Sequence, residues 1–230
     1  MDDLLNAVPY PSTLMSRGGH EEELRKVGGL CSSLYSEITN LQSSIALFDH
    51  AIFVTGEIRN RSRDRSQTNT EQERDERLTR NWPFMAAREA LGALYNFHWA
   101  LKELSILAGD PRIAVKLVSA NEISKAFDEF ERTFNKALLA RHAASHRSEI
   151  KGNPERNAHK AALSSGFIHK PKGAAVNMSD CLIDRTYTGT RKGEILKFDV
   201  TWESYAAALK IYTTVNAAVA KEDVWPHFAG

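Results

Sequence analysis

Two histidines and one arginine lie within six residues near the middle of the chain. The stretch reads Arg141-His142-Ala143-Ala144-Ser145-His146, and it closes a long amphipathic run that begins near Asn121. Histidine titrates closest to neutral pH, so it can move protons under physiological conditions. Arginine carries a permanent, forked positive charge that binds phosphate oxygens. These residue types together predict cleavage of a phosphodiester bond.

The same residues leave two other interpretations open. Cations in the last turn of a helix also interact favourably with the negative end of the helix dipole and with its terminal carbonyls. His142 and His146 are four residues apart, which is the spacing of a two-histidine metal site, and His159 or His169 could supply a third ligand. No His-Glu-x-x-His pattern is present, so we expect neither a metal nor another cofactor.

Helix geometry limits how the stretch can work. Arg141 and His146 lie about 140° apart on an ideal helix, so they do not point at the same phosphate. They converge only if the helix bends or ends near Ser145, or if two chains share the site. The second of these alternatives is a composite site in a homodimer.

Four amphipathic helices are expected to position this stretch. Apolar residues recur every three or four positions at about 30–48, 82–107, 120–141 and 202–219. Helices with one apolar stripe each must bury their stripes on one another. Residues 182–187 and 194–200 flank a glycine-containing turn, which is typical of a hairpin. We therefore expect an all-α fold, a four-helix up-and-down bundle with a small late β-hairpin.

Helix-start signals agree with these ranges. Asn81 followed by Trp82-Pro83 is typical of a helix N-terminus. Ser119 and Glu122 form a capping box, in which each side chain satisfies a backbone N–H group. Glycine residues at 28–29 predict an interruption before the first core helix.

We expect one domain, at residues 21–220. A flexible N-terminal arm (1–20) precedes it and a C-terminal tail (221–230) follows it. A charged insertion at about 57–80 contains seven arginines and six acidic residues, which predicts either a solvated helical extension or a mobile loop.

A basic loop at about 147–180 follows the Arg-His stretch. Long loops in compact domains are often functional. Because attraction to phosphate depends on local clusters of Lys and Arg, we take Arg147, Lys151 and Arg156 as candidates for binding phosphate groups.

Composition places the chain among ordinary globular proteins. It has 230 residues, with 42% hydrophobic and 26% charged, and a net charge of +1 that indicates no partner by itself. The sequence has neither a secretory signal pattern nor an apolar run long enough to span a membrane. We expect a cytoplasmic protein that does not bind membranes, in which Cys31 and Cys181 are free thiols.

The Arg141-His142-x-x-x-His146 stretch at the close of the third helix resembles the Arg-x(4–6)-His signature of the HEPN superfamily. Members of that superfamily commonly have Asn, Asp or His after the Arg. The late hairpin and closing helix are similar in outline to its abortive-infection members. The resemblance covers about residues 21–220, although only the Arg-His motif is diagnostic.

The resemblance implies a metal-independent endoribonuclease, a hydrolase that works as a homodimer. In such enzymes the RNA 2′-hydroxyl attacks the neighbouring phosphate and leaves a 2′,3′-cyclic phosphate. His146 would act as general acid/base, Arg141 would stabilise the transition state, and His142 would orient either group. The expected role is a toxin or phage-defence protein, with an antitoxin protein as a candidate partner.

Two alternatives remain. One is a non-catalytic helical dimer that binds nucleic acid or a protein through the segment Arg59 to Arg65 and the loop after His146. The other is a histidine-ligated metalloenzyme.

Overall fold

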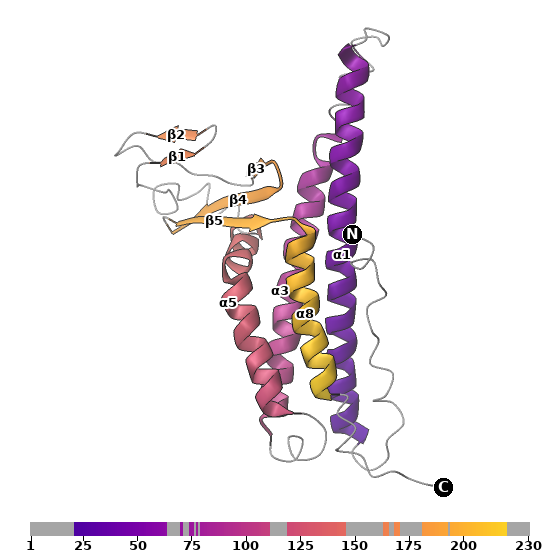
Figure 1. Cartoon of the computed structure of the whole chain (residues 1–230), viewed down its shortest axis with the longest axis vertical. Coiled ribbons are helices and arrows are strands. Elements are labelled where there is room, and N and C mark those ends of the chain that lie inside the picture. Colours follow the sequence, from indigo (N-terminus) through magenta and orange to yellow (C-terminus); the bar gives the residue numbers. More distant parts are fainter. Residues whose placement is uncertain are drawn as a thin grey trace. The chain divides into compact units, whose positions relative to one another are not determined.

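The computed structural model is mostly helical. It describes residues 21–63, 70, 74–75, 77, 79–110, 119–145, 163–165, 168–170, 181–192 and 194–219. The described residues include four helices and a small three-stranded antiparallel sheet near the C-terminus (Figure 1). The arm predicted at 1–20 and the tail predicted at 221–230 lie outside the described residues.

The four helices are α1 (Glu21–Arg63), α3 (Trp82–Ala108), α5 (Ala120–Ser145) and α8 (Trp202–Val219). Three of the four helices lie close to the predicted ranges, and α1 extends beyond its predicted range at both ends. The predicted starts of α3 and α5 are confirmed, because the carbonyls of Asn81 and Ser119 accept the first helical hydrogen bonds, from Met85 and Ile123 respectively. The local capping signals therefore set where these helices begin.

Helix α1 is longer than its apolar stripe. The prediction that Gly28 and Gly29 interrupt it is wrong, because α1 runs through both. A Cβ atom at either position would meet nothing within 4 Å, so no close packing requires glycine there. A helix tolerates such residues at a cost of about 1 kcal/mol each. At its other end α1 continues to Arg63, so the first part of the charged insertion is a helical extension.

The predicted late hairpin is part of a larger sheet. Strand β5 (Glu194–Asp199) lies where the second strand was predicted, and it pairs with β4 (Thr186–Arg191). The prediction of one strand at 182–187 is wrong, because this range holds the end of a third strand, β3 (Cys181–Ile183), a turn and only the start of β4, and β3 pairs antiparallel with β4. Asp184, with φ of 52°, begins the β3–β4 turn, and Asp tolerates this left-handed conformation. The region expected to be one basic loop also contains a two-stranded ribbon, β1 (Leu163–Ser165) with β2 (Ile168–Lys170).

The chain divides into two compact units. The first takes in residues Met1–Gln42, Ala93–Asn135 and Trp202–Gly230. Its core contains Phe97 of α3 stacked on Phe130 of α5, with ring centroids 5.1 Å apart. His98 stacks beside Phe130, and its Nε2 lies 2.5 Å from a carboxylate oxygen of Glu131. His98 is thus a packed, hydrogen-bonded histidine.

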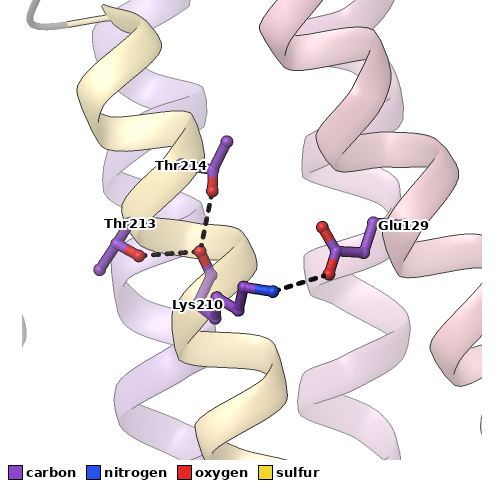
Figure 2. Close-up of polar contacts among 4 residues, drawn as sticks. All are labelled: Glu129, Lys210, Thr213 and Thr214. Atoms are coloured by element: carbon purple, nitrogen blue, oxygen red, sulfur yellow. Dashed lines mark hydrogen bonds and ion pairs between the residues drawn. The ribbon is translucent and has the colours of Figure 1, made fainter.

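Polar contacts at the surface of this unit join α5 to α8. Lys210 Nζ lies 3.5 Å from a carboxylate oxygen of Glu129, while the hydroxyls of Thr213 and Thr214 donate to the Lys210 carbonyl (Figure 2). The Lys210 side chain is 74% exposed. Exposed ion pairs of this kind contribute little free energy, so we attribute the stability of this unit mainly to burial of its apolar core.

The second unit takes in Ser43–Gly92 and Lys136–Thr201. Its core combines the middle of α1, the start of α3, the end of α5 and the three-stranded sheet. The fully or nearly fully buried side chains include Ile45, Phe48, Ala51, Ala87, Leu91, Ala137, Ala140, Tyr187, Leu196, Phe198 and Val200. The sheet therefore contributes core residues and is more than a surface hairpin.

The Phe97–Phe130 stack predicts a large effect of truncation. Phe130 is fully buried, so Phe130→Ala should lower the free energy of unfolding by about 3–5 kcal/mol, through lost burial and the cavity left behind. Urea unfolding followed by circular dichroism measures this difference. The matched control is Ile106→Ala, because Ile106 is 62% exposed and surface truncations stay within about 0.5 kcal/mol. Equal effects of the two variants would contradict the assignment of Phe130 to the core.

The two cysteines, both free thiols, should differ in reactivity. Burial raises the pKa of Cys31 to about 12 from an ordinary value of 9.0, so its reactive thiolate is scarce at pH 8. We expect iodoacetamide to label Cys181, which is half-buried, well before Cys31 in the folded protein. Mass spectrometry of peptides over time measures both rates, and equally fast labelling would show that Cys31 is accessible.

The same shift predicts a loss of stability in alkali. Below about pH 9 the thiol of Cys31 is protonated in both the folded and the unfolded chain, so its raised folded-state pKa does not change the free energy of unfolding. As the pH rises towards 12, the unfolded chain releases the thiol proton while the folded chain retains it, so the free energy of unfolding falls.

Candidate functional site

The last turns of α5 hold two of the three predicted catalytic residues. The apolar face of the helix is buried at Phe134, Ala137 and Ala140. Arg141 and His142 follow directly and are half-buried. Their position against the core, in the last two turns of a helix, agrees with the sequence prediction.

The remaining predicted site residues lie outside the described residues. These are His146, Arg147, Lys151 and Arg156. The structure therefore brings Arg141 and His142 together, and it does not test the convergence of either with His146. Since α5 is described as far as Ser145, His146 is the next residue of the chain.

The β4–β5 hairpin adds a cation near this helix end. Leu139 of α5 lines a small cavity of about 140 Å³ together with Lys192, Glu194 and Leu196 of the hairpin. Figure 1 shows β4 and β5 lying across the C-terminal end of α5. Leu139 is two residues before Arg141, so the exposed Lys192 belongs to the same end of the helix.

Sequence reasoning did not assign Lys192 to the site. Lys192 follows β4 directly and has a φ of 50°, a left-handed conformation that a lysine rarely adopts. The signal in the sequence was the basic pair Arg191-Lys192 within a predicted turn. What the sequence lacked was the long-range contact that puts this turn beside α5.

Arg185 holds the sheet in place within this unit. Its Nε donates to the carbonyl of Val200 at 2.9 Å, and its Nη1 lies 2.5 Å from a carboxylate oxygen of Asp49 on α1. The guanidinium also lies over the ring of Phe48, 5.1 Å from the ring centroid. Arg185 lies in the β3–β4 turn and Val200 follows β5, at the same end of the sheet, so one side chain links this end of the sheet to α1.

The described residues contain no group of three or more His, Cys, Asp or Glu side chains that could hold a metal ion. His159 and His169, the predicted third ligands, have no described side chains. In the described part of the site, Arg141 and Lys192 supply positive charge. Such charge binds phosphate oxygens and stabilises negative charge that develops on them.

No family model, curated protein or solved structure matches this chain. None of the described helices is long and apolar enough to cross a membrane.

The contacts of Arg185 predict a local effect of its loss. Arg185→Gln should lower stability by about 1–2 kcal/mol, because it removes a charge-assisted hydrogen bond and a ring contact from a side chain that is 40% exposed. Hydrogen exchange should accelerate first in the amides of β4 and β5. Lys197→Gln, on the exposed face of β5, is the control. Uniform acceleration across both units would contradict a role for Arg185 in holding the sheet.

Proposed function

We propose that this chain is a metal-independent endoribonuclease of the HEPN type. The observation that carries the proposal is the pair Arg141 and His142, half-buried at the end of α5 and followed within four residues by His146. We propose in addition that the four helices form an up-and-down bundle.

The proposed reaction uses the RNA as its own nucleophile. The 2′-hydroxyl attacks the adjacent phosphate and the 5′-oxygen leaves, which yields a 2′,3′-cyclic phosphate and a 5′-hydroxyl. His146 moves a proton at the 2′-hydroxyl or the leaving oxygen, as a group that titrates near neutral pH can. Arg141 binds the phosphorane oxygens through its two-pronged guanidinium, and His142 orients one of these groups.

Lys192 and the candidates Arg147, Lys151 and Arg156 supply positive charge for the RNA backbone. Lys192 is exposed at the hairpin that lies across the end of α5, where it can bind a phosphate next to the one that reacts. Contacts of this kind position the strand without reading its sequence.

A homodimer completes the proposed site. The angle of about 140° between positions five residues apart on a helix separates Arg141 from His146 of the same chain. A second chain brings its own copy of the motif to the cleft. We place the enzyme in the cytoplasm as a toxin or phage-defence protein, controlled by an antitoxin partner.

Cleavage of labelled single-stranded RNA tests this function. We expect cleavage that persists in EDTA and fragments that end in a cyclic phosphate. Arg141→Ala and His146→Ala should each lower the rate by about 100-fold or more, as loss of a charge-stabilising or proton-transferring group does, and His142→Ala should lower it less. Mass spectrometry of the fragment ends identifies the product.

Matched controls exclude general effects of charge and of histidine. Arg132→Ala removes an exposed arginine earlier on α5, and His50→Ala removes an exposed histidine of α1. Both should cleave at the wild-type rate. Intact RNA at high enzyme concentration would overturn the proposal in favour of a non-catalytic helical dimer. Cleavage abolished by EDTA would instead indicate a metalloenzyme.

A further inference from the structure

A second candidate site lies in the second unit, on residues that the proposed ribonuclease does not use. A pocket of about 390 Å³ opens beside the second half of α1. Its lining is Phe53, Val54, Glu57, Ile58, Asp75, Thr79 and Trp82. The volume is within the range of pockets that bind small groups.

Two sides of the pocket have different origins in the chain. Phe53 and Glu57 are one turn apart on α1, as are Val54 and Ile58, so all four lie along one side of the helix. The opposite side begins later in the chain, at the half-buried Asp75. The buried Thr79 secures this side, because its hydroxyl donates to the Asp75 carbonyl at 2.9 Å.

The exposed apolar surface extends beyond the lining of the pocket. Phe53 is 65% exposed, Trp82 is 38% exposed, and Met85, three residues after Trp82 on α3, is 57% exposed. Large apolar side chains that gather at a surface often mark a binding site for another protein. Aromatic residues and methionine are also enriched in such interfaces.

The charged side chains that line the pocket indicate which kind of group it binds. The two ionisable side chains in its lining, Glu57 and Asp75, are both carboxylates. Arg74, Arg77 and Arg80 are exposed on the neighbouring segment, but they do not line the pocket. An aromatic surface flanked by carboxylates attracts a cation with an apolar stem, because the ring faces and the carboxylates both attract positive charge. The same carboxylates repel a phosphate group.

We propose that this pocket receives a lysine or arginine side chain from a segment of a partner protein. The aliphatic stem of the cation lies against Phe53 and Trp82, and its charged end lies between Glu57 and Asp75. Apolar residues next to the cation in the partner cover Met85, which a small free cation would leave exposed. The partner segment is therefore both basic and apolar.

Selection of peptides on the full chain tests this proposal. A phage-displayed library of random 12-residue peptides is selected on the wild-type protein and counter-selected on the variant carrying Glu57→Gln and Asp75→Asn. We expect enriched peptides with a Lys or Arg next to aliphatic or aromatic residues. Calorimetry with a synthetic peptide should give an affinity that falls by about tenfold or more in this variant, as loss of charge-assisted contacts predicts.

The controls distinguish loss of the pocket from loss of charge or of folding. Glu103→Gln removes an exposed carboxylate from the other unit, and it should leave peptide affinity unchanged. Replacing the basic residue of the peptide by glutamine should weaken binding as much as the double variant does. RNA cleavage by the double variant should equal that of the wild type, so failure of either proposal leaves the other standing.

Several results would overturn the proposal. These are the absence of enriched peptides, enriched peptides that lack a basic residue, or equal binding to wild type and double variant. Spermidine or a single-stranded RNA that displaces every enriched peptide would assign the pocket to a free polyamine or to nucleic acid. Self-association that the double variant abolishes would assign it to a second copy of the chain.

Discussion

The interactions of the Arg185 guanidinium are the constraint on which the geometry of the candidate site depends. This one side chain joins the β3–β4 turn, the residue after β5 and helix α1, through Val200, Asp49 and the ring of Phe48. An arginine suits this place because its fork can donate in two directions while its flat face covers an aromatic ring. Because the side chain is partly exposed, its contribution to stability is modest and its effect is mainly on position.

Because the β4–β5 hairpin is part of this sheet, the contacts of Arg185 also set the position of the hairpin at the end of α5. The cavity shared by Leu139 and Lys192 puts a lysine at the same helix end as Arg141. A helix C-terminus carries partial negative charge on its last carbonyls, which attracts cations and repels phosphate. A phosphate-binding site at such an end therefore needs additional positive charge, and Arg141 and Lys192 can supply it.

Most of the helical fold could be predicted from the sequence, because it is encoded locally. The stripe of α3 begins after an Asn-Trp-Pro signal and α5 begins after a capping box, and both signals are read over a few residues. The break expected at Gly28 and Gly29 is absent, since glycine lowers helix stability by less than the surrounding helix can offset. Strand β3 has three residues, too few to give an alternating pattern.

Only those residues of the candidate site that lie on a single helix, α5, could be predicted from the sequence. Arg141 and His142 were expected at a helix end, and they lie there. The contact between Arg185 and Asp49 joins residues 136 positions apart, and no local pattern indicates it. Lys192 and the pocket at Phe53 and Trp82 depend on contacts of this long-range kind, so sequence periodicity could not find them.

In the proposed enzyme, two chains share one RNA-cleaving site built on Arg141 and His146. Complementation tests it most directly: Arg141→Ala and His146→Ala chains, each inactive alone, are mixed and allowed to exchange subunits. If each site takes Arg141 from one chain and His146 from the other, random pairing restores about a quarter of wild-type activity, since half of the dimers are mixed and each has one intact site. A mixture no more active than its parents, although mixed dimers have formed, would contradict the shared site.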